Sequence, residues 1–337
     1  MGSGARHDAK FGMTNPTSAG AAAGHGARTS GYVGRLAPSP TGALHLGNAR
    51  TFLLAWLAAR SRGGTLRLRI EDIDGPRIQA GAAAATLEDL RWLGLDWDGE
   101  VWVQSQRLPV YADAVARLFA AGHLYPCVCT RAEIDRAASA PHGPDDDGPV
   151  YPGTCRGRFP SLAAARAATG REPALRFGVA AAALPFVDGC AGPQAGILRG
   201  DFVVQKRDGG PAYQLAVVVD DHAQGITEVV RADDLLPSTP RQLALYRALG
   251  LQPPAFRHVP LVVGGDGLRL AKRHGDTSLR HLRAQGVAAA AVVGHLGWLA
   301  GLVPRGTSCL PADLLPGFAF ERLPAGPVRG DEHGLLG

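Results

Sequence analysis

Residues 32–70 contain a strand, a helix and a second strand in close succession, and this run constrains the fold more than any other feature. The segment YVGRLA is apolar enough for a buried strand, and apolar residues then recur at helical spacing through GNARTFLLAWLAARSR. TLRLRI, at 65–70, alternates apolar residues with arginine, as a strand with one buried face does. Strand, helix and strand within about 40 residues indicate a parallel crossover. We therefore predict an α/β fold with a doubly wound parallel sheet.

Composition limits the remaining possibilities only weakly. The chain has 337 residues, a formal net charge of +5 and a pI near 9.1, which is compatible with a polyanionic partner. Three of its five cysteines fall within one short segment, which favours a metal site in a reducing, cytoplasmic environment over disulfides. The sequence contains no run of about 18 apolar residues, so we expect no membrane-spanning helix. We expect residues 1–30, which lack the apolar core of a signal peptide, to be a disordered leader, with a transit peptide as the alternative.

Further segments can be assigned from their periodicity and their turn residues. The segment Pro211 to Leu236 begins with an apolar run that fits either a strand or a buried helix. Ser238 and Thr239 are candidate caps of the helix that follows. We expect helices at 82–93, 110–121, 238–249 and within 277–301, and strands at ITEVVR and RHVPLVV.

The stretch RLAPSPTGALHLGNAR joins the first strand to the first helix, where doubly wound folds bind phosphate-bearing ligands. The helix N-terminus offers free N–H groups, and His45 could donate a hydrogen bond to a phosphate oxygen. Gly42 and Gly47 would permit a close approach of the backbone. The alternative is a proline-rich turn with a surface histidine.

Two later loops carry charges that suit the same kind of ligand. In RIEDIDGPR, the acids Glu71, Asp72 and Asp74 follow the second strand and could hold an ammonium group or a ribose hydroxyl. In GGDGLRLAKRHGD, a glycine-rich loop bearing Lys272 between two arginines could close over a polyphosphate. The alternatives are a solvated turn and an exposed basic loop.

Together these motifs resemble the class I aminoacyl-tRNA synthetases of the glutamyl branch. APSPTGALHLGN is similar to the first signature of that family, and RLAKR to its second. RIEDID and AYQLAVVVDDHAQGITEVVRADDLL resemble its glutamate and adenosine segments, so the likeness covers about residues 32–275. The resemblance implies a Rossmann-like core with an inserted zinc-containing subdomain and a short C-terminal helical part. The second signature departs from the pattern at Arg269 and Ala271.

Because only a short segment follows Val303, the chain most resembles the truncated branch of this family. That branch activates L-glutamate with ATP without needing tRNA, and then esterifies queuosine in the anticodon of tRNA(Asp). The resemblance thus implies ATP with Mg²⁺, glutamate and queuosine-bearing tRNA(Asp) as partners, and a monomer without membrane contact. The alternatives are a glutamyl-tRNA synthetase that charges a tRNA 3′ end, another nucleotidyl transferase, and a non-catalytic RNA-binding paralog.

The resemblance also assigns roles to individual residues. His45 and Lys272 would be catalytic, and ATP would be bound by His45, Gly47, Asn48 and Lys272. Arg231 would hold the side-chain carboxylate of glutamate; its alternative is a surface ion pair with Asp233 or Asp234, and that of Tyr213 is a core aromatic. The glutamate-binding residues would be Arg35, Leu36, Ala37, Pro38, Ser39, Glu71, Tyr213 and Arg231.

Cys127, Cys129 and Cys155 supply three thiolates, which leave one position of a tetrahedral zinc site open. The resemblance implies Tyr151 as the fourth ligand, whereas His142 and Asp145 to Asp147 lie in the intervening loop as rivals. The alternative is three ordinary buried cysteines.

These assignments divide the chain into six parts. We expect the leader at 1–30, the first half of the nucleotide-binding fold at 31–122, an inserted acceptor-binding-like subdomain with the zinc site at 123–195, the second half of the fold at 196–262, an ATP loop and helical segment at 263–303, and a flexible tail without an anticodon-binding domain at 304–337.

Overall fold

The computed structural model describes residues 31–73, 75–137, 150–268, 270 and 277–330. The leader, Asp74, the second signature including Lys272 but not Leu270, and the rival ligands His142 and Asp145 to Asp147 lie outside these ranges.

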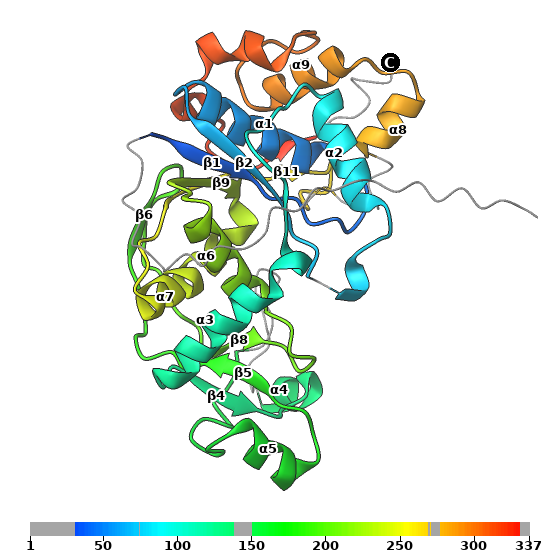
Figure 1. Cartoon of the computed structure of the whole chain (residues 1–337). Coiled ribbons are helices and arrows are strands. Elements are labelled where there is room, and N and C mark those ends of the chain that lie inside the picture. The colour runs from blue at the N-terminus through cyan, green and yellow to red at the C-terminus, as the bar shows by residue number, and fades with distance from the viewer. Residues whose placement is uncertain (1–30, 74, 138–149, 269, 271–276, 331–337) are drawn as a thin grey trace, which may run out of the picture. The chain divides into compact units, whose positions relative to one another are not determined.

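The first strand, helix and strand form the crossover that the sequence predicted. Strand β1 (Val33–Leu36) pairs in parallel with β2 (Thr65–Ile70), and helix α1 (Leu46–Arg60) connects them. A short strand β3 (Trp102–Val103) extends the sheet on the far side of β2, also in parallel. Figure 1 shows α1 between these strands and helix α9 (Ala289–Leu299). The apolar face of α1, including Leu53, Leu54 and Leu57, is fully buried there.

A second parallel ladder lies beside the first. Strand β9 (Glu228–Ala232) pairs with β10 (Ala255–Val259), and helix α7 (Thr239–Leu249) connects them after a 3-10 turn at Asp233–Ser238. The backbone N–H of Thr227, just before β9, donates to the carbonyl oxygen of Val33 at 2.8 Å. This bond joins the two ladders at the amino ends of β1 and β9.

The undecided segment after Pro211 is a helix. Helix α6 (Tyr213–Ala223) buries a continuous run of apolar side chains, which is why its sequence lacks a clear helical period. The strand expected over RHVPLVV is interrupted, because Pro260 has no N–H to continue the ladder; β11 (Val262–Val263) follows it. Ser238 does not cap α7 through its side chain, which instead accepts from Gln214. Outside the insert, further helices are α2 (Ala82–Trp92), α3 (Leu108–Ala120) and α8 (Leu279–Ala284). Two 3-10 turns lie at Gly75–Arg77 and Gln104–Arg107.

The inserted part is an antiparallel sheet with two helices. The strands of this sheet are β4 (Leu124–Cys127), β5 (Ala174–Phe177) and β8 (Phe202–Gln205), with β5 in the middle; they lie in the green part of Figure 1. Because β8 pairs with β5, this sheet includes a strand that lies beyond the boundary expected at residue 195. The other elements here are α4 (Arg131–Ala137), α5 (Leu162–Thr169) and a hairpin of β6 (Phe186–Asp188) and β7 (Gly192–Gln194).

The expectation of a flexible tail is wrong for residues 304–330. Short 3-10 turns at Pro311–Gly317 and Phe320–Arg322 lead to strand β12 (Val328–Arg329), which pairs in parallel with β11. Leu314 and Phe320 are only 2% and 8% exposed. Isolated apolar side chains anchor this segment to the core, and such anchors leave no period in the sequence. No helix within the described ranges has the length and apolar character needed to cross a bilayer.

Candidate active site and metal centre

His45 caps the N-terminus of α1. Its Nδ1 accepts a hydrogen bond from the backbone N–H of Asn48 at 3.3 Å, so a neutral ring carries its proton on Nε2. A Cβ at Gly47 would lie 3.1 Å from the imidazole, so glycine at this position leaves room for the ring. The first turn of α1 contains no acidic side chain. An imidazole N–H and the partial positive charge of a helix N-terminus both suit phosphate oxygens.

Arg35 contacts β9 and α6, and the turn after β1 contacts the segment that follows β2. The guanidinium of Arg35 is buried; its Nη1 donates to the carbonyl oxygen of Val230 at 3.0 Å, and its Nε lies 3.6 Å from Asp221. The carbonyl oxygen of Pro38 accepts from the N–H of Glu71 at 2.9 Å. The turn is therefore fixed against the end of β2.

In the turn after β1, the backbone is better placed than the side chains to contact a ligand. The side chain of Leu36 is fully buried in the core, so only its backbone could contact a ligand. Ala37 is half-buried, and Ser39 is exposed with its carbonyl oxygen bound to the N–H of Thr41.

Two acidic residues that follow β2, Glu71 and Asp72, have different partners. One oxygen of Glu71 accepts two hydrogen bonds from the fully buried Arg69, which also binds Asp221 at 2.9 Å. Burial raises the pKa of Glu71, and the cations Arg69 and Arg35 oppose that rise. Asp72, in contrast, accepts from the N–H and hydroxyl of Ser105 and stabilises that turn. Of the two, only Glu71 is placed with the buried cations.

Arg231 is buried, which excludes the surface ion pair considered above. Its guanidinium donates to Nε2 of His258 at 2.8 Å, to Oε1 of Gln242 at 2.9 Å and to Oγ1 of Thr239 at 2.9 Å. None of these three acceptors carries a negative charge. Burial without such a partner lowers the pKa of Arg231. A buried cation held only by neutral groups is suited to an anionic ligand.

Tyr213 interacts electrostatically with the charged residues described above. It is the first residue of α6, and burial raises the pKa of its phenol. The charges of Arg231, Glu71 and Arg35 all act on that pKa, as does the charge of Asp221. Four of the residues assigned to glutamate are therefore close enough to interact electrostatically, although they come from β1, the end of β2, α6 and β9.

The three cysteines of the insert also converge. The Sγ atoms of Cys127, Cys129 and Cys155 lie within 4.8 Å of one another. The hydroxyl of Tyr151 lies 3.3 Å from Cys127 Sγ and 3.7 Å from Cys129 Sγ. Arg176 donates to Cys127 Sγ at 3.3 Å and stacks over the ring of Tyr151. Three sulfurs and one phenol oxygen are a suitable donor set for a four-coordinate metal ion, and the nearby cation would stabilise thiolates.

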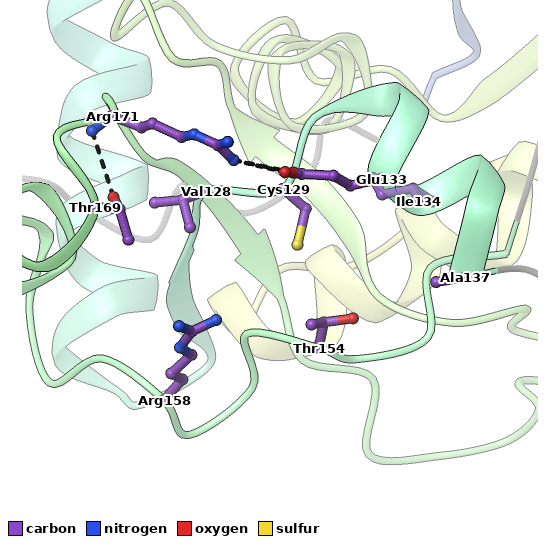
Figure 2. A pocket seen from close by; sticks show the side chains of 9 residues that line it. All are labelled: Val128, Cys129, Glu133, Ile134, Ala137, Thr154, Arg158, Thr169 and Arg171. Carbon is purple, nitrogen blue, oxygen red and sulfur yellow. Dashed lines mark hydrogen bonds and ion pairs between the residues drawn. The ribbon is translucent and has the colours of Figure 1, made fainter.

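A pocket of about 410 Å³ adjoins this centre (Figure 2). Cys129 points into it, below an ion pair between Glu133 and Arg171. Arg158 and Thr154 line the opposite side. Cys127 and Cys155 are buried and Cys129 is partly exposed, so Cys129 is the member of the cluster that lines this pocket.

Comparison with known proteins defines the class. The family described as "tRNA synthetases class I (E and Q), catalytic domain" matches residues 32–309. A Glutamyl-Q tRNA(Asp) synthetase of Symbiobacterium thermophilum is 53% identical over 309 residues, which cover 88% of this chain and 95% of that protein. The protein of that name from Nitratidesulfovibrio vulgaris is 49% identical, with coverage of 88% and 94%. The chain therefore belongs to the class I tRNA synthetases and, among them, to the glutamyl-Q tRNA(Asp) synthetase family.

A solved structure supports the fold. A glutamate tRNA ligase from Elizabethkingia meningosepticum, crystallised in complex with its amino acid, superimposes with a TM-score of 0.77 at 26% identity. The likeness covers 91% of this chain and 68% of that one. The resemblance inferred from the sequence motifs is thus confirmed.

Sequence reasoning missed several residues that shape both sites. Arg69 and Asp221 organise the region around Glu71, and His258 holds Arg231. A usable signal existed for Asp221, because two consecutive acids inside the apolar run of α6 need buried partners. Arg176 beside the cysteines gave no such signal, since arginine in an exposed strand looks the same.

Proposed function

We propose that this protein activates glutamate with ATP without requiring tRNA, and then transfers the glutamyl group to queuosine in the anticodon of tRNA(Asp). It would thus be a ligase of the aminoacyl-tRNA synthetase type. The observation that carries the proposal is the buried set of Arg35, Glu71 and Arg231: Asp221 and Arg69 link Arg35 to Glu71, and the charges of all three residues act on the phenol of Tyr213. Two cations and one carboxylate match the two carboxylates and the ammonium group of glutamate.

The groups in this region divide naturally between the ends of the amino acid. Glu71 would bind the ammonium group, because Arg69 holds only one of its two oxygens. Arg231, whose acceptors His258, Gln242, Thr239 and the carbonyl oxygen of Leu235 are all neutral, would bind the side-chain carboxylate. Arg35 and the backbone of the turn from Leu36 to Ser39 would position the α-carboxylate. Glutamine would leave the buried charge of Arg231 unpaired, so the same contacts select glutamate.

In the reaction, an α-carboxylate oxygen of glutamate attacks the α-phosphorus of ATP, and pyrophosphate leaves. The N–H of His45 Nε2 and the N-terminus of α1 near Gly47 and Asn48 would hold phosphate oxygens. Lys272 is proposed to stabilise the charge on the departing pyrophosphate. Positioning and electrostatics suffice, since no covalent enzyme intermediate is needed. The two parallel ladders, joined through Thr227 and Val33, would form one doubly wound nucleotide-binding sheet.

Two metals belong to the proposal. Mg²⁺ would accompany ATP and neutralise its phosphates. Zn²⁺ would be held by Cys127, Cys129, Tyr151 and Cys155, where it would fix the strand β4 to the loop around Tyr151. Its role would be structural, because four protein ligands leave no open position.

The acceptor is tested with isotope-labelled glutamate, ATP and purified tRNA. We expect label on queuosine-containing tRNA(Asp) and none on tRNA(Asp) that lacks queuosine. Mild base should release it, as expected for an ester. Transfer to the 3′ end of tRNA(Glu) would show instead an ordinary glutamyl-tRNA synthetase. Adenylate formation without transfer to any tRNA would refute the acceptor.

A further inference from the structure

A hydrogen-bonded chain connects Arg231 to the hairpin of β6 and β7. Nδ1 of His258 lies 2.6 Å from Oδ2 of Asp188, and Nε2 of the same ring accepts from Nε of Arg231 at 2.8 Å. All three side chains are buried, with Arg231 the most exposed at 4%. The chain joins a strand of the parallel ladder to a hairpin more than 40 residues away in sequence.

The two partners of His258 determine where its proton lies. A carboxylate can only accept, so Nδ1 must be the protonated nitrogen. An arginine can only donate, so Nε2 must be unprotonated. Burial lowers the pKa of His258, and the charge of Arg231 lowers it further against the opposing effect of Asp188. The ring is therefore a neutral acceptor with one defined tautomer.

Asp188 is itself held by the backbone of the hairpin. Its Oδ1 accepts from the N–H groups of Cys190, Ala191 and His258 at 2.8–3.1 Å. Burial opposes ionisation, but these bonds and the one from His258 lower the pKa of Asp188 to about 2. The carboxylate is thus ionised and cannot rotate without losing several bonds.

The other edge of the Arg231 guanidinium is fixed in the same way. Its Nη1 donates to Oε1 of Gln242, whose Nε2 donates to Oε1 of Gln214 at 3.0 Å. Gln214 in turn donates to the hydroxyl of Ser238 at 2.9 Å. The bond to Gln242 uses one of the two N–H groups on Nη1, whereas the bond to His258 uses the only N–H on Nε. Nη2 donates to Oγ1 of Thr239 at 2.9 Å and to the carbonyl oxygen of Leu235 at 3.4 Å. Any carboxylate ligand must therefore approach the second N–H on Nη1.

We propose that Asp188 and His258 are positioning residues that set the orientation of Arg231 and hence the affinity for the side-chain carboxylate of the amino acid. The inference rests on the proposed glutamate activation and extends it to two residues outside the motifs of the site. Neither residue is proposed to touch the substrate. Asp188 defines the tautomer of His258, and His258 presents a lone pair to Nε of Arg231.

Asp188→Asn tests this directly, because an amide of the same shape cannot serve both the imidazole and the hairpin N–H groups as a carboxylate does. We expect KM for glutamate in ATP–pyrophosphate exchange to rise by about tenfold or more, with KM for ATP unchanged. Asp201→Asn is the matched control. Asp201 is a buried carboxylate of the insert, bound to Tyr125 and Arg156, and its loss should leave both KM values unchanged.

A second readout does not depend on activity. In protein labelled with ¹⁵N-histidine, long-range proton–nitrogen correlation at pH 7 should show His258 with its proton on Nδ1, assigned by comparison with His258→Gln. A proton on Nε2, or on both nitrogens, would overturn the inference even in a fully active enzyme. So would a normal KM for glutamate in a folded Asp188→Asn variant. Absence of exchange in the wild-type protein would instead overturn the proposed function, and this inference with it.

Discussion

One oxygen of Glu71 is held by Arg69 through two hydrogen bonds, at 3.0 and 3.3 Å from its Nη2 and Nε. Arg69 is fully buried and also binds Asp221 and Gln224. Burial raises the pKa of Glu71, while the charge of Arg69 favours the ionised form. The pairing thus presents a carboxylate in a buried region, where an ammonium group would find few competing water molecules.

Replacing Glu71 with glutamine should weaken amino-acid binding while preserving the fold. The amide keeps the shape but loses the negative charge that pairs with ammonium. We expect KM for glutamate to rise by about 10- to 100-fold, with a smaller change in KM for ATP, measured by exchange kinetics. Glu100→Gln, at an exposed position, is the control and should behave as wild type. An unchanged KM in Glu71→Gln would refute the ammonium role.

The two roles assigned to His45 can be separated by one substitution. Asparagine caps helices well, so His45→Asn should keep the cap of α1 and change the free energy of unfolding by less than about 0.5 kcal/mol. It removes the imidazole N–H that is proposed to hold a phosphate, so kcat for exchange should fall on the order of 100-fold. Normal exchange in this variant would leave His45 as a cap alone.

The sequence was sufficient for the crossover, because a strand, a helix and a strand in succession depend on local patterns. Apolar alternation predicted β2, and the short proline-rich turn predicted where α1 begins. Arg231 was identified by its family resemblance, but its partners were not. His258 and Asp188 meet it only through tertiary contacts, and a histidine in an apolar strand carries no mark of the residue that it will face.

Removing the phenol oxygen of Tyr151 tests the proposed fourth zinc ligand. We expect the wild-type protein to contain about one zinc per chain, and Tyr151→Phe to bind zinc at least about tenfold more weakly. Cys155→Ser should bind zinc still more weakly than Tyr151→Phe does. Cys309→Ser, outside the cluster, should retain it. Metal analysis and competition with a chromogenic chelator measure these values. Full zinc affinity in Tyr151→Phe would exclude the tyrosine as a ligand.

The ordered C-terminal segment makes a prediction about stability. The ring of Phe320 is 8% exposed and lies against the guanidinium groups of Arg257 and Arg62. Phe320→Ala should lower the free energy of unfolding by about 3 kcal/mol, measured by urea denaturation. Leu310→Ala, at a side chain that is 60% exposed, should cost less than about 0.5 kcal/mol. Equal stability of the two variants would mean that the segment does not contribute to the core.

The error over this segment has a physical cause. Proline and glycine break helical and strand periodicity, and their abundance after Pro304 was therefore interpreted as flexibility. Leu314 and Phe320 nevertheless insert into the core from 3-10 turns, which tolerate proline at positions where an α-helix does not. Buried anchors spaced irregularly along a chain become visible only when the surface that receives them is known.

The central claim is that the buried region around Arg231 activates glutamate, and pyrophosphate exchange measures this most directly. With ATP, Mg²⁺ and labelled pyrophosphate but no RNA, we predict label in ATP when glutamate is present. We predict none with glutamine, and a loss of at least about 100-fold in kcat/KM for Arg231→Gln. The control Arg247→Gln, at an exposed position of α7, should remain active. Exchange that is absent with glutamate, or equal with glutamine, would contradict the account.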